Sequence, residues 1–223
     1  MRFKKPLLMT ALALLPFGGS GISGCKKKHY DAINREKKFQ IIEIKTSFGS
    51  MYMWLHDSTP LHKANFLKLT AEGFYNNTTF HRIIKDFVIQ GGDPNSKDSI
   101  KTNDGSGGPG YTIPAEIRDS LTHVYGAVGA ARDNNPQKAS NGSQFYIVTD
   151  VKGEHGLDKN YTVFGFIFNG MDVATTISKQ AKDINNRPNE NITMEVKLLE
   201  KTLPQLKSEF SFASLLTVSQ SIS

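Results

Sequence analysis

The segment between residues 80 and 93, FHRIIKDFVIQGGD, constrains the fold of this chain more than any other feature. Its apolar residues fit neither an amphipathic helix nor a simple strand, and they surround two strongly hydrogen-bonding side chains, Arg82 and Gln90. The Gly91-Gly92 pair and the following Asp93-Pro94 pair are typical of a turn. An arginine beside such a strand can place five fixed donors at the edge of an apolar pocket. The segment therefore predicts a site for a neutral, apolar ligand that carries a carbonyl group.

The remainder of the chain contains many short segments of alternating apolar and polar residues, which are typical of β-strands. A chain of 223 residues is long enough to form one domain with a substantial core. Thr59-Pro60 has the pattern of a helix N-cap followed by the first helical residue, and Gly73 is expected to end that helix. Helical spacing predicts a second helix over 171–182. We expect strands at 39–46, 51–55, 78–84, 87–91, 127–131, 144–149, 163–167 and 192–199.

This order of short strands with two isolated helices allows two architectures, a closed antiparallel barrel or a β-sandwich. Residues 95–104 form a polar insertion that we expect at the surface. The tail after Pro204 has about 20 residues and several large apolar side chains, including Phe210. It could dock on the domain, contact a partner or stay loose, and the sequence leaves these alternatives open.

The N-terminal residues have the organisation of an export signal, with a basic start, an apolar run over 6–17 and small residues over 18–24. The apolar run is too short to span a bilayer permanently. It ends in Ile22-Ser23-Gly24-Cys25, which resembles a bacterial lipobox, where the leader is removed before a cysteine that carries a diacylglycerol. Cys25 is the only cysteine, so an internal disulfide is impossible. We expect a signal peptide over 1–24, lipidation of Cys25 and a charged tether over 25–38.

These features predict an extracytoplasmic protein anchored by lipid in the cell envelope of a bacterium. Without the three basic residues of the leader, 24 basic residues face 21 acidic ones, and the formal net charge falls from +6 to +3. Such a modest charge gives no reason to expect nucleic acid as a partner. The histidines have no metal-ligand spacing, so we expect no metal and no cofactor. Nothing in the sequence indicates an obligate oligomer, and we expect a monomer.

Four segments together resemble the cyclophilins, the cyclosporin-type peptidyl-prolyl isomerases. They are residues 80–93, the glycine-rich loop 105–116, the NGSQFYI segment 141–147 and the LDKNYTVFG segment 157–165. All four occur in the order of the family and close to its spacing, and the resemblance covers 39–203. It implies a mainly β fold, a closed eight-stranded antiparallel barrel capped by two α-helices. It also implies an isomerase domain over 39–203 and a C-terminal extension over 204–223.

The resemblance implies roles for ten residues. It makes Arg82 the donor to the prolyl nitrogen and places Phe87 and Gln90 with it as catalytic residues. It assigns substrate binding to Val88, Ala131, Arg132, Gln144, Tyr146, Leu157 and Tyr161. Three of these depart from the family pattern. Val88 stands where the family often has methionine, Arg132 where many members have asparagine and Tyr161 where many have histidine. The aromatic residues could instead be ordinary core, and Arg132 could form a local ion pair with Asp133.

The expected function is that of a prolyl isomerase acting on exported proteins as they fold, with proline-containing unfolded or partly folded polypeptides as partners. Uncatalysed isomerisation takes tens to hundreds of seconds, which is slow enough to limit folding. The main alternative is a binding module that grips proline-containing segments with little turnover. A serine hydrolase is a weaker alternative, because Ser143 is not in a G-x-S-x-G elbow.

Overall fold

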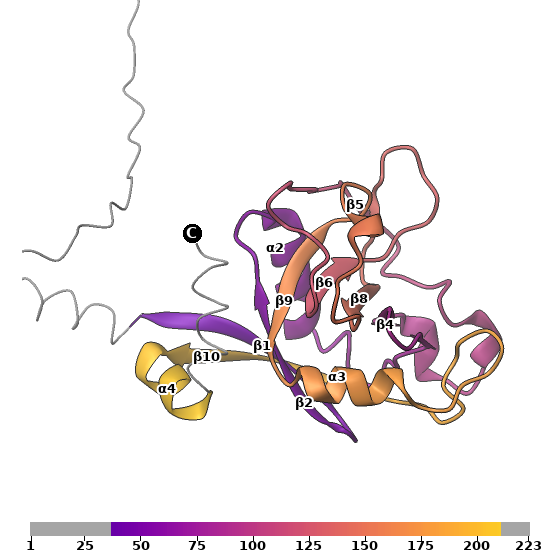
Figure 1. The fold of residues 1–223 in the computed structure, drawn as a ribbon. Coiled ribbons are helices and arrows are strands. Elements are labelled where there is room, and N and C mark those ends of the chain that lie inside the picture. Colours follow the sequence, from indigo (N-terminus) through magenta and orange to yellow (C-terminus); the bar gives the residue numbers. More distant parts are fainter. Residues whose placement is uncertain (1–36, 211–223) are drawn as a thin grey trace, which may run out of the picture.

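A computed structural model describes residues 37–210 of the chain (Figure 1). The expected signal peptide, the lipidated Cys25 and nearly all of the tether lie outside the described residues, as does the end of the tail. None of the helices between residues 37 and 210 is long and apolar enough to cross a membrane.

Eight strands form one antiparallel sheet in the order β10-β1-β2-β9-β6-β8-β4-β3. They are β1 (Lys38–Thr46), β2 (Gly49–Leu55), β3 (Arg82–Ile83), β4 (Val88–Gly91), β6 (Ala127–Ala130), β8 (Phe145–Val148), β9 (Val163–Asn169) and β10 (Glu195–Thr202). Two further strands that the sequence did not predict, β5 (Thr112–Ile113) and β7 (Ser140–Asn141), pair with each other in a separate ribbon. The prediction of a mainly β fold with eight antiparallel strands is confirmed.

The two outer strands of the sheet, β3 and β10, are connected through the segments that lead into them. The amide of Phe80 donates to the carbonyl of Ile192 over 3.0 Å, and the amide of Met194 donates to the carbonyl of Thr78 over 2.9 Å. Two predicted strand boundaries are nevertheless wrong. Residues 78–80 and 192–194 meet at an isolated bridge, whereas β3 begins at Arg82 and β10 at Glu195.

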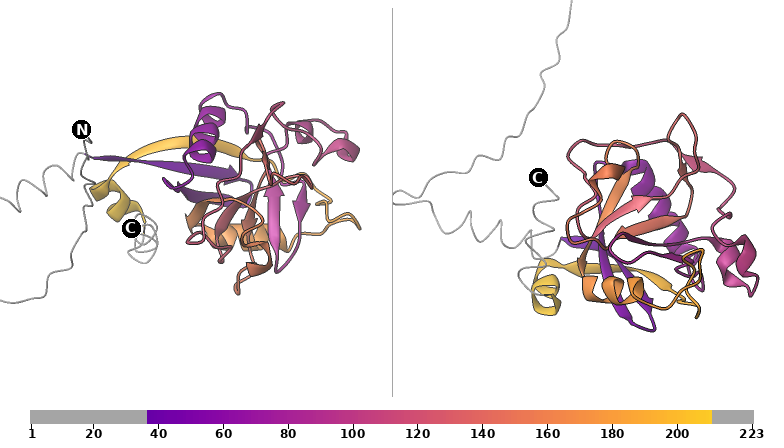
Figure 2. Two further views of the ribbon diagram at one scale, coloured as in Figure 1. Left: turned by 90° about the horizontal axis from the view of Figure 1, so that it is seen from above. Right: turned by 45° about the vertical axis from the view of Figure 1, so that its right-hand side comes forward.

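Three α-helices accompany the sheet in the described part of the chain: α2 (Pro60–Ala71), α3 (Met171–Ser178) and α4 (Leu203–Glu209). Figures 1 and 2 show α2 and α3 on opposite sides of the strands. Helix α3 ends four residues earlier than the predicted 182. The polar residues that follow it form a turn in which Lys182 bridges to Pro188 instead of continuing the helix.

Helix α2 begins at Pro60 with Thr59 at the N-cap position, both as predicted, but the Thr59 side chain does not supply the capping hydrogen bond. The Thr59 hydroxyl donates to the carbonyl of His56, and its side chain makes no capping bond. The carboxylate of Glu116 accepts instead from the free amides of Leu61 and His62 at 3.0 and 2.9 Å. The first turn of a helix needs such acceptors, and a carboxylate there also suits the helix dipole. A carboxylate 55 positions from Leu61 therefore supplies the capping hydrogen bonds that the Thr59 side chain does not make.

The C-terminal extension docks on the domain as far as it is described. Leu206 of α4 and Phe210 are buried against Ile41, Trp54 and Phe168, on the face of the sheet that the main core does not use. Phe210 meets the ring of Phe168 edge-on at 5.1 Å. Of the three alternatives that the sequence left open, docking is therefore the one observed for residues 203–210. Figure 2 places α4 at one end of the molecule and the 95–104 insertion at the other.

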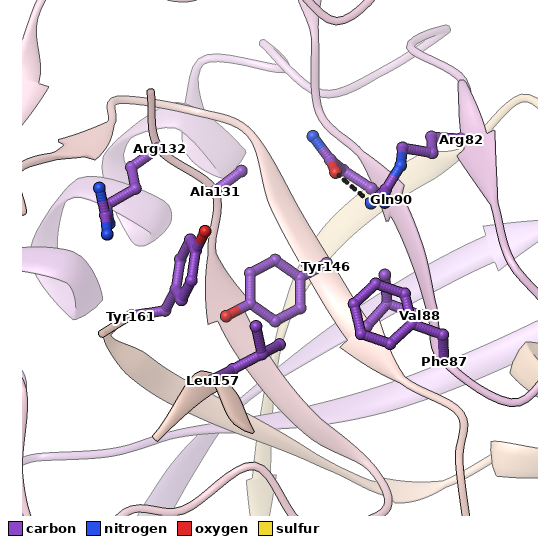
Figure 3. Close-up of a pocket in the computed structure, with 9 residues that line it drawn as sticks. All are labelled: Arg82, Phe87, Val88, Gln90, Ala131, Arg132, Tyr146, Leu157 and Tyr161. Carbon is purple, nitrogen blue, oxygen red and sulfur yellow. Dashed lines mark hydrogen bonds between the residues drawn. The ribbon is translucent and has the colours of Figure 1, made fainter. Parts of the chain in front are cut away.

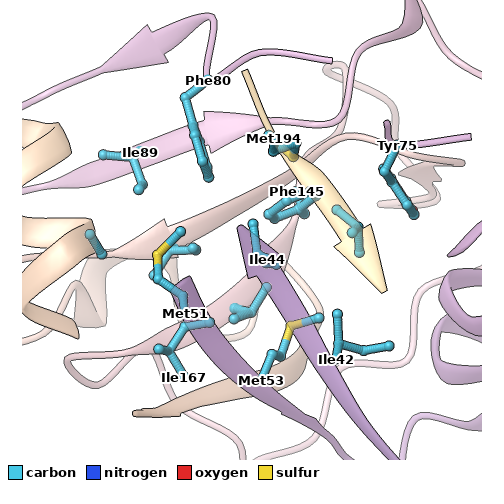
Figure 4. Close-up of a cluster of buried hydrophobic side chains, with 14 of the residues drawn as sticks. Ile42, Ile44, Met51, Met53, Tyr75, Phe80, Ile89, Phe145, Ile167 and Met194 are labelled. Atoms are coloured by element: carbon cyan, nitrogen blue, oxygen red, sulfur yellow. The ribbon is translucent and has the colours of Figure 1, made fainter. Parts of the chain in front are cut away.

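The main core fills the inner face of the sheet (Figure 4). Along β8 the side chains alternate, so that Phe145 and Ile147 join this core while Tyr146 and Val148 point to a second apolar cluster on the outer face. This alternation is the ordinary two-residue period of a strand. It means that one short strand supplies both the core and the outer surface where the pocket lies.

Candidate active site

A pocket with a volume of about 250 Å³ lies on the outer face of β4, β6 and β8. Nine of the ten residues singled out in the sequence line it (Figure 3). They are Arg82, Phe87, Val88, Gln90, Ala131, Arg132, Tyr146, Leu157 and Tyr161. The tenth, Gln144, is not in the lining but holds Gln90 from behind. The structure thus brings the predicted residues together, whereas their individual roles remain predictions.

The floor of the pocket is the ring of Tyr146, which is 5 % exposed. Tyr146 pairs with Gly129 of β6 in the register of the sheet. A Cβ atom at position 129 would collide with the Tyr146 ring, so only glycine leaves room for the ring over the neighbouring strand. Val88 lies beside Tyr146 in the same outer cluster. The strand residues therefore form a flat apolar floor of the kind that a small ring can contact.

One side of the pocket carries Arg82, which is held by a chain of side-chain amides. The guanidinium of Arg82 donates to Gln90 Oε1 at 3.3 Å, and Gln90 Nε2 donates to Gln144 Oε1 at 3.0 Å (Figure 3 shows the first bond). Gln144 Nε2 in turn donates to the carbonyls of Gly105 and Gly107 at 3.0 and 2.8 Å. This amide relay connects the arginine to the glycine-rich loop, and it fixes the orientation of both glutamine side chains.

The far end of the relay is anchored by Asp93, whose side chain is fully buried. Its carboxylate accepts from the amides of Asn95, Gly105 and Gly107. The 95–104 insertion is therefore tied at both ends to the turn that follows β4. It forms two short 3₁₀ turns, Pro94–Lys97 and Lys101–Asn103, and lies at the surface as predicted, with Ser96 as its one buried residue.

Arg82 is half-buried, with its guanidinium carbon 5.7 Å from the centroid of the Phe87 ring. Burial lowers the pKa of Arg82 from its ordinary value, while Tyr161 acts in the opposite direction. A guanidinium nevertheless stays charged at neutral pH. A cation that is partly removed from water and has unused N–H groups is a strong hydrogen-bond donor to a ligand.

The opposite side of the pocket is formed by Leu157 and Tyr161. The Tyr161 ring meets Tyr146 edge-on, with centroids 6.0 Å apart, and the guanidinium of Arg132 lies 4.7 Å from the Tyr161 centroid. Arg132 donates to the carbonyls of Asn160 and Asp133 at 3.0 Å each. The expected local alternative, an ion pair with the Asp133 carboxylate, is not formed, because the contact is to the backbone oxygen.

Sequence reasoning missed two residues at this site, His123 and Asp158. The His123 ring is buried behind the pocket and lies 2.8 Å from the Tyr146 hydroxyl and 2.7 Å from the Asp158 carboxylate. Asp158 was visible only as part of the segment after Leu157, and nothing in the local sequence links it to position 123. Across residues 37–210, no group of three or more metal-ligating side chains is placed to hold a metal ion.

The fold and the pocket together place an apolar floor on the outer face of a β-sheet, beside a fixed guanidinium. Residues 41–197 match the profile of the family described as "Cyclophilin type peptidyl-prolyl cis-trans isomerase/CLD". The chain is 37 % identical over 159 residues to peptidyl-prolyl cis-trans isomerase-like 3 of Dictyostelium discoideum, covering 69 % of this chain and 91 % of that protein. It is 41 % identical over 123 residues to peptidyl-prolyl cis-trans isomerase B of Bacillus subtilis, covering 55 % and 78 %.

A solved structure is also similar. The cyclophilin-type isomerase of Cryptosporidium parvum, determined in the presence of the dipeptide Ala-Pro, has a TM-score of 0.63 and 29 % sequence identity, covering 72 % of this chain and 99 % of that one. The chain belongs to the cyclophilin-type peptidyl-prolyl cis-trans isomerases. It is accordingly an isomerase of X-Pro peptide bonds.

Proposed function

We propose that this isomerase twists the X-Pro amide with the help of Arg82 and acts on exported proteins during folding. Rotation about a peptide bond interrupts its conjugation, which raises a barrier of about 18–20 kcal/mol. No covalent bond has to break, so the enzyme needs only to bind the twisted amide better than either planar form. The chemistry required of the site is therefore selective hydrogen bonding together with a firm grip on the proline ring.

The proposed donor is the Arg82 guanidinium. In the twisted amide the prolyl nitrogen regains a lone pair that it lacks when planar, and a donor aimed at this nitrogen stabilises only the twisted state. The amide relay holds Arg82 through Gln90, and the apolar floor excludes water from the contact. These two features support the proposal, and the relay is the observation that carries it.

The proline ring is assigned to the floor formed by Tyr146 and Val88, between the walls made by Phe87 and Leu157. A pocket of about 250 Å³ is of the right order for one small ring with part of the adjoining backbone. The similar Cryptosporidium parvum protein was crystallised with Ala-Pro. That result supports proline-containing polypeptides as the substrates of this chain.

The expected lipid anchor places the enzyme outside the cytoplasm, as a monomer in the cell envelope of a bacterium. The support is the export signal, the lipobox and the single Cys25. Lys38 at the start of β1 pairs with Thr202 at the end of β10, so the C-terminal end of the expected tether lies beside the start of α4. Membrane fractionation of cells that carry the native chain or Cys25→Ala tests the anchor, because the variant should leave the membrane fraction.

The same proposal includes closure of the eight-stranded sheet into a barrel. The hydrogen bonds that link residues 77–80 to 192–194 join the two outer strands through the segments that lead into them. A closed sheet has no unpaired edge. Closure also supports the pocket, because the rigid sheet beneath Tyr146 then keeps the floor flat.

The decisive experiment compares the native protein with Arg82→Ala and with Arg118→Ala in an NMR exchange assay on an Ala-Pro peptide. Arg118 is an exposed arginine outside the pocket and serves as the matched control. Removal of one preorganised donor typically costs about 10²–10³ in rate, so Arg82→Ala should lose that much of kcat and Arg118→Ala should lose none.

Equal rates for Arg82→Ala and the native protein would refute the proposed mechanism while leaving the family assignment intact. If neither protein accelerates exchange although both bind the peptide, the pocket is a recognition surface. The alternative of a proline-binding module would then replace catalysis.

A further inference from the structure

His123 connects the floor of the pocket to its wall through a buried hydrogen-bonded network. Its side chain is 0 % exposed. Nδ1 lies 2.7 Å from Asp158 Oδ1, and Nε2 lies 2.8 Å from the Tyr146 hydroxyl. The three residues come from the loop before β6, from β8 and from the loop before β9. A buried network of this kind is costly unless every member is paired, and here both ring nitrogens have partners.

The direction of each hydrogen bond follows from the chemistry of the groups. A carboxylate only accepts, so His123 Nδ1 carries the proton and donates to Asp158. In the neutral ring Nε2 is then a bare acceptor, and the Tyr146 hydroxyl donates to it. Burial lowers the pKa of His123 and raises that of Tyr146, so both groups remain neutral at neutral pH. The Tyr146 ring lies nearly parallel to the imidazole, with the two ring centroids 5.9 Å apart, and the hydrogen bond to Nε2 holds it in one orientation.

The network also fastens the loop that forms the wall. The backbone amide of His123 donates to Asp158 Oδ1 over 2.8 Å, and the amide of Glu154 donates to the His123 carbonyl over 2.7 Å. The other Asp158 oxygen lies 2.8 Å from Nδ1 of His155. Asp158 directly follows Leu157, which lines the pocket, and the amide of Tyr161 donates to the Leu157 carbonyl.

We propose that His123 and Asp158 are positioning residues that fix the floor and the wall of the proline pocket against each other. This inference rests on the proposed function, in which the pocket holds a proline ring. That ring offers no side-chain donor, so its binding depends on contact area and on a pocket that is preorganised. Tyr146 pairs with Gln90 in the register of the sheet, but among the described residues no hydrogen bond joins this network to Arg82 or to the amide relay, and its loss should therefore weaken substrate binding more than the chemical step.

A second buried histidine supplies a matched control. His62 Nδ1 lies 2.7 Å from Glu116, and His62 Nε2 lies 3.0 Å from the hydroxyl of Ser140. The arrangement is chemically the same, but none of these three residues lines the pocket. Ser140→Ala therefore removes the hydroxyl group that hydrogen-bonds to a buried imidazole, as Tyr146→Phe does, but it does so outside the pocket.

The test measures kcat and KM for an Ala-Pro peptide, together with its Kd from NMR titration, in four variants of the full chain. We expect Tyr146→Phe and Asp158→Ala to raise KM and Kd about three- to tenfold with kcat changed less than about twofold, since lost ground-state binding appears in KM. Asp158→Asn should recover part of the loss because its amide oxygen still accepts from Nδ1. Ser140→Ala should leave KM and Kd unchanged.

A merely structural network would lower the melting temperature of Tyr146→Phe and Asp158→Ala as Ser140→Ala does, and it would leave KM and Kd at native values. That result would overturn the inference. If Asp158→Ala does not fold, the KM and Kd of Tyr146→Phe alone decide between the two outcomes, because that substitution removes a single oxygen atom. Peptide titration stays informative even if the native protein proves inactive, so failure of the proposed function is distinguishable from failure of this inference.

Discussion

The two sides of the pocket are held in place by different chemistry. On one side Arg82 is oriented by the neutral amides of Gln90 and Gln144, which end on backbone carbonyls. On the other side the Tyr146 ring and the loop with Tyr161 are held by an imidazole and a carboxylate. The comparison indicates that the two networks have separate roles. The first orients the Arg82 donor, and the second positions the apolar surface of the pocket. Breaking either one should therefore leave a different kinetic signature.

The largest effect in this comparison is expected from Gln90→Leu. The substitution preserves the approximate volume but removes the acceptor that holds Arg82, and a hydrogen bond to a charged group contributes about 1.5–3 kcal/mol. We expect kcat/KM to fall roughly tenfold or more, chiefly in kcat, because about 1.4 kcal/mol corresponds to a factor of ten. Steady-state kinetics on an Ala-Pro peptide provide the measurement.

Gln180→Leu is the control for this substitution, since the side-chain amide of Gln180 donates to the carbonyl of Thr176 and Gln180 does not line the pocket. A rise in KM with unchanged kcat in Gln90→Leu would contradict the separate roles of the two networks.

The second-largest expected effect is a decrease in the free energy of unfolding at acidic pH. Burial lowers the pKa of His56, His62 and His123, and it lowers the pKa of His81 to about 4. Such groups bind protons more readily in the unfolded chain, so stability rises with pH through this range. The stabilisation is complete above about pH 6.5 and declines as the pH falls towards each folded pKa.

For His81 alone, the free energy of unfolding should be roughly 2 kcal/mol lower at pH 5 than at pH 7.5. Urea unfolding at the two pH values measures the change. An unfolding free energy that is equal or greater at pH 5 would show that these histidines are not buried in their neutral form. The amide relay does not titrate, so the kcat of the protein that remains folded should change little.

The smallest effect is expected from Arg132→Ala. Its guanidinium packs on the Tyr161 ring at 4.7 Å, and such contacts at exposed sites contribute about 0.5–1 kcal/mol. We expect KM to rise about two- to fivefold with unchanged kcat. The measurement is the same peptide assay, with Arg118→Ala as the control. A drop in kcat would mean that Arg132 acts on the X-Pro amide of the substrate and not on the Tyr161 side of the pocket.

The local sequence was sufficient to predict individual helices and strands, because the geometry of each element repeats from residue to residue. Strand β8 and helix α2 were correctly located because each is specified by residues that lie within or beside one element. The predictions failed where a distant residue changed the outcome. Glu116 supplies the capping hydrogen bonds that the Thr59 side chain does not make, and residues 192–194 bond to 78–80 outside the two outer strands.

The sequence by itself determined the family, the mainly β architecture and nine of the residues that line the pocket, because each motif is a contiguous run whose chemistry can be recognised locally. Only the tertiary structure decided how these residues are held. Gln144 reaches Gln90 and His123 reaches Asp158 across 54 and 35 positions of the chain. Hydrogen bonds over such separations depend on distances and angles that exist only once the sheet is assembled, so no local pattern carries their signal.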